Sequence, residues 1–172
     1  MTSEVQSQAM IRQLRADDLP ALEWGGEYRH FRRLYREIYQ GACMGRAVMW
    51  VAELPPAGVI GQVFVQLDSA RKELADGAIR AYIYGFRIQA LYRSQGLGGR
   101  MLATVEGDLQ RRRFYWATLN VARENPDARR FYERHGYQVV ADEPGRWYYM
   151  DDDNLRHDVH EPAWRMEKRI KD

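Results

Sequence analysis

The stretch RSQGLGGRML, residues 93–102, places three glycines within four positions, between a β-rich segment and a run of helix-forming residues. Glycine inside a helix costs about 1 kcal/mol relative to alanine, so these glycines indicate a turn where a strand passes into a helix. The first N–H groups of such a helix have no partner within it, and together with the helix dipole they attract an anion. The sequence therefore predicts a strand, an anion-binding glycine loop and a helix near the middle of the chain.

Two common phosphate-binding loops do not fit this stretch. The P-loop requires a Lys-Ser/Thr pair after its last glycine, and none is present. The dinucleotide-binding fingerprint requires a third glycine where Met101 stands and an acidic residue where the chain has Asn120. A purely structural role, in which the glycines let the helix pack closely on the strand, stays open.

Hydrophobic periodicity predicts the elements around the loop. Strands are expected at 10–14, 47–54, 58–67, 78–91, 114–121, 137–151 with a bend at Pro144-Gly145, and 162–170. Helices are expected after an N-cap at Asp17, at 27–41 with Gly41 as the stop, at 97–113 and at 125–136. Helices inserted singly between strands predict an α/β or α+β fold with a mixed sheet.

Length and charge narrow the class of protein. The 172 residues suit a single domain over residues 1–172. With 26 Lys and Arg against 24 Asp and Glu, charge gives no argument for a nucleic-acid partner and none is expected. The Arg-rich first and central helices keep RNA binding as an alternative hypothesis.

Cys43 is the only cysteine, which excludes an intrachain disulfide and a cysteine-based zinc site. The single cysteine also favours a cytoplasmic protein. No leader or apolar stretch of about 20 residues is visible, so no membrane partner is expected. HDVH at 157–160 offers too few ligands for zinc, so no metal is expected.

Residues Arg93 to Gly98 read R-x-x-G-x-G, and here the chain resembles the GNAT superfamily of N-acetyltransferases, whose pattern Q/R-x-x-G-x-G/A follows a central strand. Residues 120–138, NVARENPDARRFYERHGYQ, resemble a second family segment, in which a strand ends in Asn and a helix starts at another Asn. The matched positions there are Asn120, Asn125, Ala128, Phe131, Tyr132, Gly136 and Tyr137. The resemblance implies a mostly antiparallel sheet of about six to seven strands, flanked by helices on both faces and splayed between its two central strands.

The resemblance also implies an acyltransferase that uses acetyl-CoA as co-substrate and acetylates an amine directly in a ternary complex. Backbone groups of Arg87 and Ile88 would pair with the thioester arm, the N–H of Ile88 would polarise the thioester carbonyl, and Tyr132 would protonate the departing thiolate. The residues expected to bind coenzyme A are Phe86, Arg87, Ile88, Arg93, Ser94, Gln95, Gly96, Leu97, Gly98, Gly99, Arg100, Asn120, Asn125, Ala128 and Tyr132.

The chain departs from the family at the general base. Many members carry a glutamate on the central strand, whereas this stretch reads AYIYGFR, so the base is open between Glu27, Asp68 and bulk solvent. The missing glutamate keeps a second hypothesis, a non-catalytic acyl-CoA-binding regulatory module. The acceptor is expected to be a small-molecule amine or a protein or peptide amine, and the resemblance is compatible with a homodimer. Candidate acceptor-binding residues are Trp24, Glu27, Tyr84, Trp147 and Tyr149.

Overall fold

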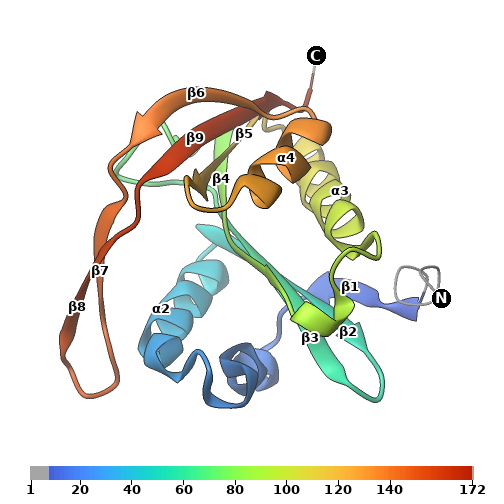
Figure 1. The fold of residues 1–172 in the computed structure, drawn as a ribbon, viewed down its shortest axis with the longest axis vertical. Helices are drawn as coiled ribbons and strands as arrows, with labels where there is room; N and C mark the ends of the chain where they lie inside the picture. The colour runs from blue at the N-terminus through green and yellow to red at the C-terminus, as the bar shows by residue number, and fades with distance from the viewer. Residues whose placement is uncertain (1–7, 172) are drawn as a thin grey trace.

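Residues 8–171 are described by the computed structural model, and a mixed sheet runs through their middle (Figure 1). Its strands are β1 (Met10–Gln13), β2 (Ala47–Leu54), β3 (Gly58–Gln66), β4 (Arg80–Ile88), β5 (Trp116–Ala122), β6 (Gln138–Glu143) and β9 (Ala163–Arg169). The strand order is β1-β2-β3-β4-β5-β9-β6, and among the strand pairs described only β4 and β5 run parallel. The predicted mostly antiparallel sheet is confirmed.

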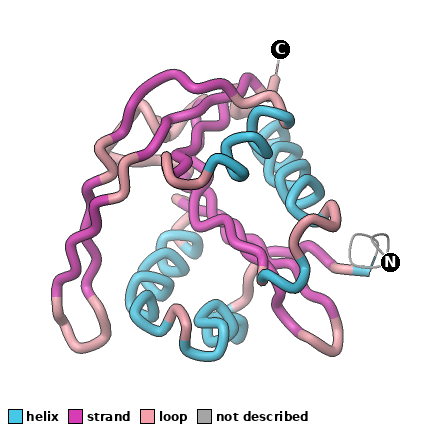
Figure 2. The backbone as a smooth tube through the Cα atoms, viewed as in Figure 1, coloured by secondary structure: helices cyan, strands magenta, loops and turns pink. Residues whose placement is uncertain are grey.

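Helices cover both faces of this sheet, as expected (Figure 2). The helices are η1 (Ala16–Gly26), η2 (Arg29–Phe31), α2 (Arg32–Cys43), η3 (Ala90–Tyr92), α3 (Leu97–Arg111) and α4 (Pro126–Arg134). One apolar cluster joins β2 and β3 to η1 and α2. A second, larger cluster lies on the other face, where α3 buries the four apolar side chains that its sequence period predicts, Met101, Leu102, Val105 and Leu109.

The two central strands part halfway along their length. They pair from Arg80 opposite Trp116 to Ile83 opposite Leu119, and beyond that point each continues without pairing to the other. The predicted splay is thus present, and it leaves one edge of β4 without a β5 neighbour from residue 84 to residue 88.

A β-bulge in β4 lies at the splay. The register of β4 against β3 shifts by one residue between Tyr84 and Arg87, and Gly85 adopts a positive φ of 60°. Because successive side chains in a strand alternate between faces, the extra residue turns Phe86 and Ile88 to the α3 side and leaves Arg87 on the α2 side. No pattern in the sequence predicted this bulge.

The segment after β6 differs from its predicted single bent strand. β6 ends at Glu143, and a separate hairpin follows, formed by β7 (Arg146–Met150) and β8 (Arg156–His160), which lies beside α2 (Figures 1 and 2). The break falls at Gly145, where φ is +67° and a Cβ would collide with the Glu161 carbonyl. Two adjacent backbones leave the sheet together at this point, and only glycine permits their close approach.

The first helical region also starts and ends differently from its prediction. A 3-10 turn precedes α2, and Gly41 lies inside α2 rather than stopping it, since the helix continues to Cys43. Met44 and Gly45 follow, and Gly45 takes the positive φ of 77° that terminates the helix. Within residues 8–171 no helix is both long and apolar enough to cross a membrane.

Candidate active site

A cavity of about 980 Å³ lies on the α3 side of the splay, between the glycine loop and α4. Ten of the residues predicted to bind coenzyme A line it: Phe86, Ile88, Arg93, Ser94, Gly96, Gly98, Gly99, Arg100, Ala128 and Tyr132. Two segments more than 20 residues apart in the chain therefore converge on one groove, here called the cofactor-side cavity.

The glycine loop forms an uncapped helix start at this cavity. Gly96 precedes α3 with a positive φ of 85°, and in the described chain no side chain caps the helix. The first backbone bond into the turn comes from Arg100, whose N–H donates to the Gly96 carbonyl. The N–H groups of residues 97–99 thus precede the first helical bond and suit an anion.

Gly98 and Gly99 also have a packing role. A Cβ on Gly98 would lie 3.3 Å from Phe131 Cζ, and a Cβ on Gly99 would lie 3.0 Å from His135 Nε2. Both neighbours belong to the α4 region, so these glycines let α4 approach the start of α3. The structural role that the sequence left open therefore coexists with the anion-binding geometry.

Five further lining residues of this cavity were not among those predicted to bind coenzyme A. They are Asp127, Arg130, Phe131, Arg134 and His135, which recur at the three- and four-residue spacing of one helix face. That spacing was the available signal. Arg130 pairs with Asp127, and the arginines make the cavity electropositive overall.

Five predicted cofactor residues lie outside the lining of this cavity. Leu97 is buried in the core, and the Gln95 amide donates to the Leu91 carbonyl at 3.1 Å. Asn125 caps α4, where its side chain accepts from the Ala128 N–H at 3.1 Å. Arg87 and Asn120 lie on the opposite side of the sheet.

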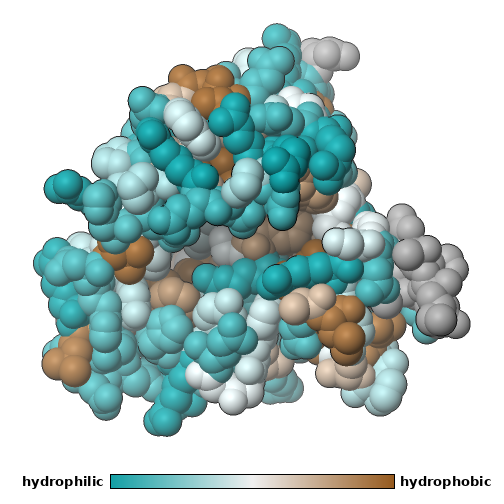
Figure 3. All heavy atoms as spheres, in the orientation of Figure 1, coloured by the Kyte–Doolittle hydropathy of each residue, from teal (hydrophilic) through white to brown (hydrophobic). Residues whose placement is uncertain are grey.

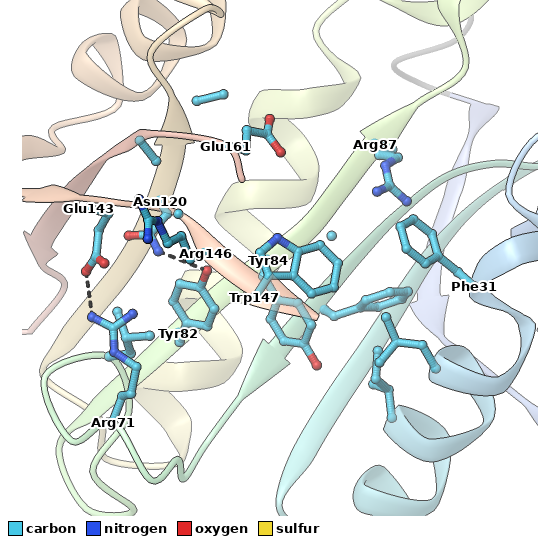
Figure 4. Close-up of a pocket in the computed structure, with 18 of the residues that line it drawn as sticks. Phe31, Arg71, Tyr82, Tyr84, Arg87, Asn120, Glu143, Arg146, Trp147 and Glu161 are labelled. Atoms are coloured by element: carbon cyan, nitrogen blue, oxygen red, sulfur yellow. Dashed lines mark hydrogen bonds and ion pairs between the residues drawn. The ribbon is translucent and has the colours of Figure 1, made fainter. Parts of the chain in front are cut away.

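A second cavity, of about 620 Å³, occupies that opposite side and is here called the acceptor-side cavity (Figure 4). Its walls are largely aromatic, with side chains from α2 and its preceding turn, from β3 and β4, and from the β7–β8 hairpin: Phe31, Tyr35, Phe64, Tyr82, Tyr84 and Trp147. Tyr82 and Tyr84 stack with ring centroids 5.4 Å apart. Figure 3 shows the molecular surface hollowed near its middle, with hydrophobic residues on the floor and hydrophilic residues around the rim.

Charged groups occupy two ends of the acceptor-side cavity. At one end Glu143, only 4% exposed, pairs with Arg71 at 2.7 Å and with Arg165 at 3.2 Å. At the other end Arg87 lies beside Phe31, as Figure 4 shows. No sequence motif predicted that Glu143 would lie with Arg71 and Arg165, because these partners are 72 and 22 residues away from it in the chain.

Both cavities lie along β4 at the splay, on opposite faces of the sheet, and a tyrosine lines each of them. Tyr132 lines the cofactor side and Tyr82 the acceptor side. Burial raises the pKa of Tyr132 above its ordinary value, and the nearby Tyr82 raises it further. Burial likewise raises the pKa of Tyr82 to about 12. Both phenols are therefore protonated at neutral pH.

Asn120 lies beside Tyr82 in the lining of the acceptor-side cavity. Its Nδ2 donates to the Tyr82 hydroxyl at 3.3 Å, while its buried Oδ1 has no hydrogen-bond partner among residues 8–171. A buried acceptor without a partner costs about 1–3 kcal/mol, so an N–H group from a ligand would relieve that cost.

The remaining predicted positions divide between two locations. Tyr84 and Trp147 line the acceptor-side cavity. Tyr149 packs behind it against Phe31, with centroids 4.9 Å apart. Trp24, Glu27 and Asp68 are absent from its lining, and Asp68 pairs with Lys72 at 2.6 Å. Residues 8–171 contain no cluster of three or more His, Cys, Asp or Glu side chains arranged to hold a metal ion.

Solved structures with this fold include several acetyltransferases. The ribosomal-protein-S18-alanine N-acetyltransferase of Escherichia coli is similar with a TM-score of 0.69, 20% identity, and 95% of each chain covered. The spermidine/spermine N-acetyltransferase SpeG of Vibrio cholerae gives 0.71 and 17%, covering 96% of this chain and 95% of that one. NAA60 of Arabidopsis thaliana, in complex with acetyl-CoA, gives 0.70 and 20%, covering 94% and 98%. At these identities the likeness establishes the fold alone.

Sequence comparison identifies the class. A search of curated proteins finds no relative. Residues 9–137 match the acetyltransferase (GNAT) family, which covers the glycine loop, both central strands and α4. The chain therefore belongs to the GNAT family, and it is an acyltransferase.

Proposed function

We propose that this acyltransferase transfers an acetyl group from acetyl-CoA directly to an amine, with both substrates bound at once. The observation that supports this most is the pair of cavities that flank the β4–β5 splay on opposite faces of the sheet, since direct transfer requires two substrates to reach one point from separate sites. No covalent enzyme intermediate is needed, and Cys43, the only cysteine, is exposed and lines neither cavity.

The cofactor-side cavity suits coenzyme A. Its pyrophosphate would bind the open N–H groups of residues 97–99, with Arg100, Arg130 and Arg134 adding positive charge. The unpaired edge of β4 would take the pantetheine arm as a substitute strand. The Ile88 N–H is our candidate for polarising the thioester carbonyl.

Tyr132 is the proposed general acid. Its phenol lines the cofactor-side cavity, and its raised pKa keeps the proton available across the neutral and mildly alkaline range. The amine must lose a proton before or during attack. Glu27 and Asp68 are exposed and lie outside the acceptor-side cavity, so we propose that this proton leaves to water.

Thermal unfolding with acetyl-CoA tests cofactor binding. A ligand that binds only the native state adds about 2.7 kcal/mol at 100 times its dissociation constant, so a clear rise in Tm is expected. Absence of any rise at saturating acetyl-CoA would contradict the proposal.

Tyr132→Phe then tests turnover. It should lower kcat for acetyl transfer by about 100-fold or more while the affinity for acetyl-CoA is retained. Tyr148→Phe, at an exposed hairpin tyrosine, is the matched control and should behave as wild type. If acetyl-CoA binds but no amine is ever acetylated, the regulatory-module hypothesis replaces the enzyme hypothesis.

A further inference from the structure

Arg87 presents an unneutralised cation to the acceptor-side cavity. Within residues 8–171 its guanidinium makes no ion pair with a carboxylate, and its one side-chain hydrogen bond goes from Nη1 to the Tyr35 hydroxyl at 2.9 Å. A guanidinium carries five N–H donors, so most of them are left for a ligand.

Aromatic rings hold this arginine in place. Its Cζ lies 4.2 Å from the centroid of Tyr28 and 5.4 Å from that of Phe31. Together with the Tyr35 hydrogen bond, these contacts fix the plane of the guanidinium, which reduces the entropy lost when a ligand binds. The β4 bulge is what brings Arg87 to this side of the sheet.

The charge balance of the whole cavity is also positive. Three arginines line it, Arg71, Arg87 and Arg146, against two glutamates, Glu143 and Glu161. Glu143 is paired with Arg71 and Arg165. Outside that cluster, Arg87 and Arg146 face one carboxylate, Glu161. A polycationic acceptor would therefore meet repulsion, whereas a carboxylate would meet a preorganised bidentate partner.

The reacting amine of an α-amino acid lies close to its carboxylate, because only the α-carbon separates the two groups. A carboxylate on Arg87 would therefore set the amine beside the edge of β4 that β5 leaves unpaired, residues 84–88. That edge is where the thioester arm is proposed to bind. The side chain of the amino acid would extend along the aromatic walls of the cavity.

Resting on the proposed function, we infer that the acceptor is a small amine that also carries a carboxylate, an amino acid with an apolar or aromatic side chain, and that Arg87 binds its carboxylate. The cavity volume of about 620 Å³ is within the range for small-molecule sites.

Matched pairs of acceptors test this inference. L-phenylalanine is compared with 2-phenylethylamine, and L-methionine with 3-(methylthio)propylamine, with spermidine as the polycation. The readouts are kcat/KM from release of the coenzyme A thiol and the Tm of the coenzyme A complex with each amine. The wild type should favour the amino acid of each pair by about 10- to 100-fold and should reject spermidine.

Three variants assign the effect to Arg87. Arg87→Met should abolish the preference within each pair, and Arg87→Lys, which keeps the charge but loses the planar fork, should leave a smaller one. Arg36→Met, an exposed α2 arginine outside the cavity, should keep the full preference.

The inference is overturned if decarboxylated amines react as well as the amino acids, if no carboxylate-bearing amine in the panel binds or reacts, or if the preference survives in Arg87→Met. Should Arg87→Met fail to fold, the wild-type preference and Arg87→Lys decide. Failure of acetyl-CoA to raise the Tm would instead refute the proposed function, so the two failures are distinguishable.

Discussion

Replacing Gly85 by alanine tests whether the β4 bulge depends on a glycine. At its φ of +60° an L-residue is strained, and a Cβ there would lie 2.6 Å from Phe64 Cδ2 and 3.0 Å from Cε2. Phe64 is 1% exposed and its ring contacts those of Tyr35 and Tyr84, so moving it away from the new Cβ would disturb both contacts and push it toward the acceptor-side cavity.

The two costs of Gly85→Ala add to a measurable loss. Left-handed backbone costs an L-residue about 1–2 kcal/mol, and overpacking of a core costs about 1–3 kcal/mol. The free energy of unfolding should therefore fall by about 2–5 kcal/mol. For a protein of this size that corresponds to a Tm lower by about 4–20 °C.

Urea unfolding measures this loss, with Gly41→Ala as the control. Gly41 lies inside α2 with open space around it, so alanine there should stabilise by about 0.4–1 kcal/mol. Acetyl-CoA binding is followed in parallel, since a straightened β4 would move Phe86 and Ile88 away from the cofactor-side cavity. A Gly85→Ala protein as stable as wild type would refute the reasoning about the bulge.

Three further changes probe contacts around the site. Glu143→Gln leaves Arg71 and Arg165 without their shared carboxylate, so the free energy of unfolding, measured in urea, should fall by about 2 kcal/mol. A fall of less than about 0.5 kcal/mol would mean that the cluster does not stabilise the fold. Asn125→Ala removes the cap of α4 and should cost about 1 kcal/mol, with Asn125→Asp retaining most of the stability; equal losses in both would contradict a capping role. The Tyr82 pKa is raised from 10.0 to about 12, so the folded state holds the phenol proton more tightly than the unfolded state does. This proton therefore adds to the free energy of unfolding in full below pH 10, and its stabilising effect is lost as the pH rises through 12. Between pH 9 and 12 the free energy of unfolding should therefore fall less steeply with pH in Tyr82→Phe than in wild type. If the two proteins lose stability in parallel over this range, the assignment to Tyr82 is refuted.

Local patterns were enough to predict most of the fold. The glycine loop, the apolar period of α3 and the cap at Asn125 are each encoded within a few residues, and the structure has α3 and α4 within two residues of their predicted ends. The mixed sheet followed from the order of strands and helices, and its splay followed from resemblance to a family that the chain does belong to.

Features that depend on distant partners were not predictable. The bulge at Gly85 shows only in the pairing of β4 with β3 and in the contact with Phe64, two features that no local pattern records. β8 was missed because five residues of polar alternation, RHDVH, resemble a solvated loop until β7 pairs with them. The acceptor-side cavity combines Arg71, Arg87 and Glu143, whose proximity exists only in the folded chain.

The sheet separates the two cavities, and it is open only where β4 and β5 part. Under the proposed function, acetyl-CoA and the amine acceptor would then bind and dissociate on opposite sides of the molecule, and neither would block the other. Coenzyme A could be replaced by acetyl-CoA while the acetylated acceptor is still bound. The same separation lets η2, α2 and the β7–β8 hairpin change over evolutionary time to suit a new acceptor while the glycine loop and α4 stay as they are.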